Sequence, residues 1–137
     1  FGSDVLIYEI DENRARTVVG EGQVAELEAE RLKAEPAYAN LAELGLGVLA
    51  DFGIEPCGSV LLDEKLGLHI AFGRSDHFGG QVGPEQFSTP DAVIHIDRVY
   101  LPSLQPRIHV FRVELRDDSG GKTLLMKDGN YEINFDS

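Results

Sequence analysis

The sequence predicts a single α+β domain that is rich in strands and contains two or three short helices. Short runs of β-branched and aromatic residues alternate with turn residues along most of the chain. One longer segment, residues 23–35, has the hydrophobic periodicity of an amphipathic helix. The chain has 137 residues, of which 42% are hydrophobic, so residues 1–137 suit one domain with its own core.

The first third of the chain predicts a strand pair followed by the helix. Asp4–Ile10 and Arg16–Val19 are rich in β-formers, and the turn residues Asp11–Asn13 lie between them. Gln23–Glu35 carries apolar residues along one side and charged residues elsewhere, and Pro36 marks its end.

The middle of the chain predicts short elements separated by glycine. Tyr38–Leu44 is expected to form a short helix that runs toward Gly45–Gly47. Val60–Lys65 is expected to be helical, Leu68–Phe72 to be a buried strand, and Gly83–Pro90 to be a loop.

The last third predicts strands. Ala92–Tyr100 alternates between apolar and polar residues, and Arg107–Leu115 is expected to form another strand. Thr123–Met126 and Tyr131–Phe135 flank Asp128-Gly129, which is the strongest hairpin signal in the chain.

Composition argues against several classes of partner. Only 12 basic residues face 24 acidic ones, for a net charge of −12, and no basic stripe is present, so nucleic acid and anionic membranes are poor partners. No apolar run approaches the roughly 18–20 residues that cross a bilayer, and no signal peptide is visible. The first residue is Phe1, so we expect further residues upstream.

Cys57 is the only cysteine, which fits a reducing compartment such as the cytoplasm. We interpret it as a turn thiol rather than a nucleophile.

Two segments carry histidine and carboxylate groups at a spacing that suits a metal. His95 and Asp97 lie two residues apart, so in a strand they project from the same face, with Cα atoms roughly 6.5–7 Å apart. The alternative is that the aspartate orients the histidine, or that the histidine is hydrogen-bonded inside the core. His69 lies in an apolar strand, and Glu64 precedes it across an expected turn at Gly67, which lets both side chains meet at one end of the sheet. The alternatives are that His69 is a core residue with its hydrogen bonds satisfied, and that Glu64 forms an ordinary surface salt bridge with Lys65 or another neighbour.

Three further residues are weaker candidates. Glu43 lies either on the polar face of a short helix or at a glycine-rich turn that delivers its carboxylate into a closed site. Asp76 and His77 follow the predicted strand in a loop, where functional residues concentrate; His77 is a candidate acid, base or extra ligand, or simply an exposed loop residue. His109 is interpreted as a strand-face residue without function.

The sequence contains no phosphate loop, no His-Glu-x-x-His, no Cys-x-x-Cys and no Gly-x-Ser-x-Gly motif.

Three separate motifs, in order and with their spacing, resemble the thermophilic (aminopeptidase T-like) family of dinuclear metallo-aminopeptidases. They are Asn40–Gly47, Asp63–Gly73 and His95–Asp97, within a matching stretch that runs from about Val18 to Tyr100. The C-terminal hairpin around Lys127–Tyr131 also looks like the end of that family's chain.

The resemblance implies a function and a site. It places Glu43, Glu64, His69, His95 and Asp97 on positions that bind two divalent ions, of zinc, cobalt or manganese. Such ions polarise a peptide carbonyl and lower the pKa of a bound water, which attacks it. The implied substrate is the N-terminal residue of a peptide, and the implied assembly is a homodimer.

The sequence also departs from the family in ways that bear on activity. The family has an N-terminal half that supplies another active-site glutamate, and this chain lacks it. A tyrosine usually stands seven residues after the histidine of the His-x-Ala-x-Gly motif, where this chain has Asp76, with His77 next; Leu68 stands where Thr or Val is usual. Two other functions therefore stay open. One is a non-catalytic binding or assembly domain on the same scaffold, and the other is a metal enzyme for another small substrate, such as a ring-opening dioxygenase.

Overall fold

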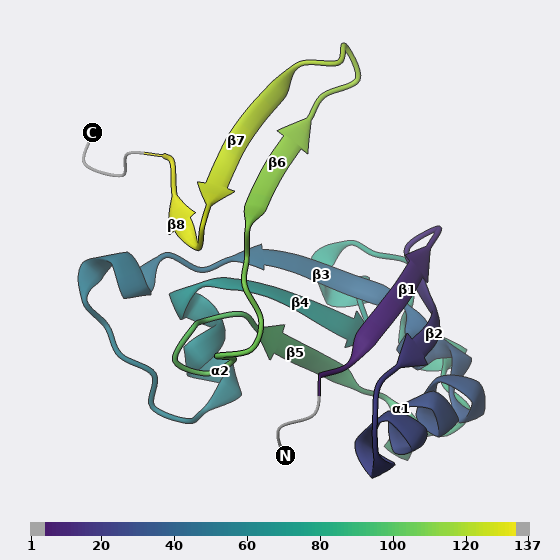
Figure 1. Cartoon of the computed structure of the whole chain (residues 1–137). Coiled ribbons are helices and arrows are strands. Elements are labelled where there is room, and N and C mark those ends of the chain that lie inside the picture. The colour runs from purple at the N-terminus through teal and green to yellow at the C-terminus, as the bar shows by residue number, and fades with distance from the viewer. Residues whose placement is uncertain (1–4, 134–137) are drawn as a thin grey trace.

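Eight strands in three antiparallel sheets, together with two α-helices, form the part of the chain that the computed structural model describes, residues 5–133 (Figure 1). This confirms the predicted α+β class. The strands are β1 (Ile7–Asp11), β2 (Arg14–Val19), β3 (Leu41–Leu46), β4 (Leu68–Gly73), β5 (His95–Val99), β6 (Arg112–Arg116), β7 (Lys122–Lys127) and β8 (Asn130–Tyr131), and the helices are α1 (Gln23–Ala34) and α2 (Val60–Asp63). Within the described residues, none of the helices combines the length and the apolarity that a membrane span requires.

The central sheet has the strand order β3-β4-β5, with β4 in the middle. Most of β4 is buried, as its apolar sequence predicts. Ala71 in β4 pairs with Glu43 on one side and with Asp97 on the other, so these three residues face the same side of the sheet. This register determines which side chains can meet on that face.

The opposite face of the central sheet forms the main core. Phe72 is fully buried there, with its ring centroid 4.9 Å from that of Tyr8 and 6.0 Å from that of Tyr38. The buried carboxylate of Glu28, on α1, accepts hydrogen bonds from both tyrosine hydroxyls, at 2.7 Å and 2.6 Å, and Arg98 of β5 lies 3.4 Å from it. These contacts join α1 to β5 on the core face of the sheet. Asp97, the neighbour of Arg98 in β5, points to the opposite face.

The C-terminal hairpin β6–β7 projects away from the central sheet (Figure 1). Asp128 and Gly129 both have positive φ, at 50° and 81°, which confirms the turn predicted between β7 and β8. Met126 packs in a buried cluster with Leu68, and the Tyr131 hydroxyl donates a 2.8 Å hydrogen bond to the carbonyl of Gly47. The hairpin is therefore joined to the segment that follows β3. Residues 134 and 135 of the predicted strand Tyr131–Phe135 lie outside the described part of the chain.

Two predictions for the middle and last thirds were wrong. The segment Tyr38–Leu44 is not a helix: Pro36–Ala39 form a short 3₁₀ turn and β3 follows directly. Pairing with β4 supplies this segment's backbone hydrogen bonds, and such long-range pairing overrides local helical periodicity. The strand expected at Arg107–Leu115 begins only at Arg112, because Pro106 and Arg107 form a turn and the carbonyls of Val110 and Phe111 accept hydrogen bonds from the turn amides of Gly129 and Asp128. His109 therefore lies in a loop.

Candidate metal centre

All five side chains that the sequence suggested as ligands converge on one face of the central sheet. They come from β3, β4, β5 and the 3₁₀ turn Glu64–Leu66 that follows α2. They form two groups, Glu43–His95–Asp97 and Glu64–His69–Asp97, and in each group the ligand atoms lie within 4.8 Å of one another. Asp97 belongs to both groups, so the two sets of ligands share one carboxylate.

The strand register explains why these residues meet. In β5, His95 and Asp97 alternate with residues that face the main core, so both side chains point to the opposite face of the sheet. His69 pairs with Gly45 of β3, one side-chain position along from Glu43 on the same face. Glu64 reaches the group from the turn before β4, through the extended Gly67.

The distances within the site are short. His95 Nε2 lies 3.2 Å from Glu43 Oε2 and 3.5 Å from Asp97 Oδ1. His69 Nε2 lies 3.3 Å from Glu43 Oε1. The two oxygens of Glu43 therefore each face a different histidine.

Backbone carbonyls determine the orientation of both imidazoles. His69 Nδ1 lies 3.0 Å from the carbonyl oxygen of Gly67, and His95 Nδ1 lies 2.7 Å from that of Arg74. A carbonyl oxygen only accepts, so each Nδ1 carries the proton and donates it. In a neutral imidazole the Nε2 lone pair then faces carboxylate oxygens, and this arrangement is favourable only when a proton or a metal ion lies between them.

Asp97 is the strongest sign of an incomplete set of interactions. Its Oδ1 is buried and accepts no hydrogen bond, although His95 Nε2 lies 3.5 Å away, and it is the single such side-chain atom among the described residues. Burial raises the pKa of the Asp97 carboxyl, and the nearby charge of Glu64 raises it further. A buried carboxylate oxygen without a partner is unfavourable, and a cation bound there would compensate it.

The pKa of Glu64 is shifted in the opposite direction from that of Asp97. Burial alone would raise its pKa, but the hydrogen bond and charge of Lys65, with contributions from Asp97 and His69, lower the pKa of Glu64 below its ordinary value. Glu64 is buried and yet stays ionised because the Lys65 ammonium pairs with it.

Two glycines make room for the ligands. A Cβ on Gly45 would lie 1.9 Å from His69 Nε2, and a Cβ on Gly47 would lie 2.5 Å from the carbonyl oxygen of Glu64. In the sequence, Gly45–Gly47 indicated only a turn. A glycine within a strand can also indicate that another group approaches the backbone closely, and this was the signal available for Gly45.

Asp76 and His77 lie at the edge of the site and differ in what they can do. Asp76 Oδ1 lies 2.5 Å from Arg74 Nε, and this hydrogen bond lowers the pKa of Asp76, so the carboxyl stays ionised and cannot donate a proton. The ring of His77 lies edge-on to that of His95, with the centroids 5.0 Å apart. Asp76 Oδ1 is 3.6 Å from His77 Nδ1. His77 is therefore the better candidate for proton transfer.

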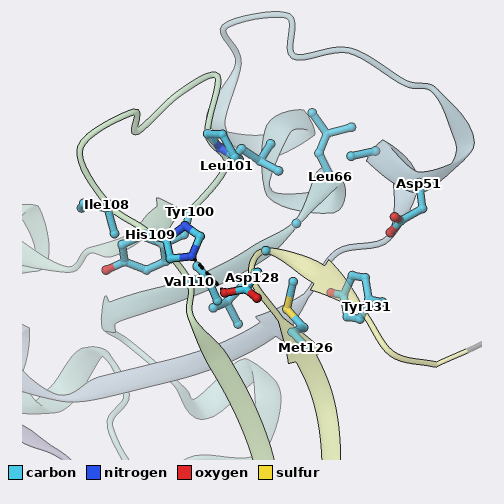
Figure 2. Close-up of a pocket in the computed structure, with 15 residues that line it drawn as sticks. Asp51, Leu66, Tyr100, Leu101, Ile108, His109, Val110, Met126, Asp128 and Tyr131 are labelled. Atoms are coloured by element: carbon cyan, nitrogen blue, oxygen red, sulfur yellow. Dashed lines mark hydrogen bonds and ion pairs between the residues drawn. The ribbon is translucent and has the colours of Figure 1, made fainter.

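A cavity lies apart from this site. It has a volume of about 150 Å³ and lies between the C-terminal hairpin, the start of β4 and the segment that follows β5 (Figure 2). Its lining includes Leu68, Tyr100 and Met126, together with His109 and Asp128, whose Nε2 and Oδ1 atoms lie 3.4 Å apart. None of the five candidate ligands lines this cavity.

The donor set suits a divalent transition metal. Each group combines one imidazole with two carboxylates, a mixture that zinc, cobalt and manganese accept. The two groups therefore have the residue types and the spacing of ligands that could hold a metal ion, and they share the carboxylate of Asp97.

No protein-family model matches the chain, and comparisons with curated proteins and with solved structures find no match either. The assignment of a function to this chain therefore depends on the geometry of the site.

Proposed function

We propose that the chain is the metal-binding part of a dinuclear metallo-hydrolase that removes N-terminal residues from peptides. The observation that carries the proposal is the position of Asp97 in both ligand groups. A carboxylate common to two ligand sets is how two-metal hydrolases keep their ions close enough to act on one substrate. The likeness of three sequence motifs to the thermophilic aminopeptidases supports the same activity.

The ligand chemistry favours hydrolysis over the dioxygenase alternative. A mononuclear iron dioxygenase typically uses two histidines and one carboxylate around one ion. Here each group has one histidine and two carboxylates, and the groups are joined. Divalent ions held in this way polarise a carbonyl and lower the pKa of water, which are the two requirements of peptide hydrolysis.

The chain's own residues have distinct tasks in this proposal. Glu43, Glu64 and Asp97 supply negative charge, and the carbonyls of Gly67 and Arg74 keep the two imidazoles facing inward. His77, next to His95, gives a proton to the leaving amine or holds one from the attacking water. Asp76 stays ionised and orients His77.

Metal binding of the purified chain tests the proposal. We expect the wild type to bind two equivalents of zinc or cobalt, and His95→Ala and His69→Ala to lose one equivalent each. Asp97→Asn, which affects both groups, should lose most of both. His109→Ala is the matched control, because His109 is an exposed histidine outside the site. Negligible metal in the wild type and in every variant would rule out the proposal, and iron as the preferred metal would favour the dioxygenase.

Activity is a separate measurement. With cobalt or zinc present, a substrate with a free N-terminal amine should be hydrolysed, and the same substrate with an acetylated amine should not. Hydrolysis of both at equal rates would argue for a different hydrolase.

A surface feature favours an additional role in assembly. Large hydrophobic side chains are exposed along one stretch of the chain between β3 and the end of α2: Leu44, Leu46, Leu49, Phe52, Ile54, Val60, Leu61 and Leu62. Such a concentration is typical of a contact surface, and it agrees with the homodimer that the family likeness implies. If the chain is only an assembly domain, replacing all five ligands with alanine will leave its oligomeric state unchanged, and the wild type will bind no metal.

A further inference from the structure

Lys65 lies directly beside the candidate metal centre. It follows Glu64 in the 3₁₀ turn Glu64–Leu66, and its ammonium pairs with Glu64 Oε1. The Glu64 side chain is only 10% exposed, whereas the Lys65 side chain is 58% exposed. The charged end of Lys65 therefore reaches from solvent to a nearly buried carboxylate.

The position of Lys65 affects one ligand group more than the other. Its partner Glu64 belongs to the group Glu64–His69–Asp97 and not to the group Glu43–His95–Asp97. An ammonium and a divalent ion cannot pair with the same carboxylate oxygen at the same time without strong repulsion. The group Glu64–His69–Asp97 thus contains a direct ion pair with an internal cation. Lys65 also interacts with Glu43 and Asp97, but more weakly than with Glu64, and among the described residues it forms no direct ion pair with either of them.

We propose that Lys65 is a displaceable internal cation, which holds the Glu64 carboxylate until a second metal ion replaces it. This inference rests on the proposed two-metal function and adds an order of loading to it. The first ion binds at Glu43, His95 and Asp97. The second binds at Glu64, His69 and Asp97 only after Lys65 has moved away.

The side chain of Lys65 suits this movement. It has a flexible four-carbon stem, and its exposure gives the ammonium a solvated position to move to. A lysine amine is charged at neutral pH, so its displacement from Glu64 by a metal ion is a competition between two cations. The protein would then hold one ion when metal is scarce and two when it is plentiful.

Calorimetric titration of the full chain with zinc or cobalt tests the order of loading. We expect the wild type to show two binding steps of different affinity. Lys65→Met should tighten the weaker step by about tenfold or more and change the stronger step much less. Lys65→Arg keeps the charge and should keep the weak second step.

Lys33→Met is the matched control, because it removes one charge at an exposed position of α1, away from the site. If Lys65→Met and Lys33→Met bind the second ion equally tightly, or if Lys65→Met tightens both steps to the same extent, the proposal is wrong. If both ions bind but Lys65 has no effect, only this inference fails. If no variant binds metal, the proposed function fails with it.

Discussion

The imidazole of His69 occupies the space where a side chain at Gly45 would lie. A Cβ built on Gly45 falls 1.9 Å from His69 Nε2, far inside any allowed contact. The two residues pair across β3 and β4, so neither can move away without disturbing the sheet. The missing side chain on β3 is therefore part of the site, although glycine itself binds nothing.

Gly45→Ala should damage the ligand group that contains His69. The new methyl group forces the ring out of place, and misorienting a ligand in this way costs about 10–100-fold in metal affinity. Overpacking should also lower the free energy of unfolding by about 1–3 kcal/mol. Titration with zinc and thermal denaturation measure the two effects. Leu44→Ala, on the same strand but exposed, is the control; equal metal binding by both variants would contradict the role of Gly45.

Asp97→Asn should stabilise the metal-free protein while it weakens metal binding. Burial raises the pKa of Asp97 in the folded state above its ordinary value of 3.8. The stability associated with this group is therefore full below pH 3.8 and is lost as the pH rises through the higher folded-state pKa. Asparagine does not ionise, so the variant does not lose this stability as the pH rises.

The measurement is thermal denaturation with a chelator present. At pH 8 the melting temperature of Asp97→Asn should exceed that of the wild type by a few degrees, and the difference should shrink as the pH falls toward 4. With saturating zinc, the wild type should become the more stable protein. A variant that is less stable than the metal-free wild type at pH 8 would show that Asp97 contributes to packing instead.

His77→Asn should reduce turnover without removing metal. Loss of a positioned proton-transfer group typically costs about 10²–10⁴-fold in rate, and we expect that loss in kcat with little change in KM. Metal content should match the wild type, because His77 lies outside both ligand groups. Asp76→Asn should have a smaller effect, of about tenfold, because it only orients His77. Loss of metal in His77→Asn would instead make His77 a ligand.

Glu35→Gln should weaken the attachment of the loop around Ser88 to the end of α1. Ser88 donates to Glu35 Oε2 through its hydroxyl at 2.6 Å and its amide at 2.9 Å. These hydrogen bonds lower the pKa of Glu35, so their stabilisation is present above its ordinary value of 4.5 and is lost as the pH falls through the lower folded-state pKa. At pH 7 the variant should lose about 1–2 kcal/mol of stability.

Urea denaturation at several pH values measures this loss. The gap between Glu35→Gln and the wild type should narrow in acid, below pH 4.5. Glu30→Gln is the matched control, because Glu30 is an exposed residue of the same helix. A gap that stays constant with pH would mean that the charge of Glu35 has no part in the contact.

Several local features of this protein could be predicted from its sequence. The alternation in His95–Val99 places His95 and Asp97 on one face, and the strand confirms it. The helix Gln23–Ala34 and the turn at Asp128-Gly129 were also predicted, because their signals lie within a few neighbouring residues. The residue types of the site, histidine and carboxylate, are likewise visible in the sequence.

Other features depend on residues far apart in the chain. Glu43 was predicted to lie either on the polar face of a short helix or at a glycine-rich turn, but hydrogen bonds to β4 make its segment a strand. The contact of Gly45 with His69 follows from tertiary packing, which no local pattern encodes.

The sequence alone determined the α+β class, the turn positions and the kinds of ligand, because propensity and side-chain periodicity act over short distances. Only the tertiary structure decided that Asp97 belongs to both candidate ligand groups. That outcome depends on the register of three strands from distant parts of the chain, and a slip of one residue would turn a strand's ligands to the opposite face.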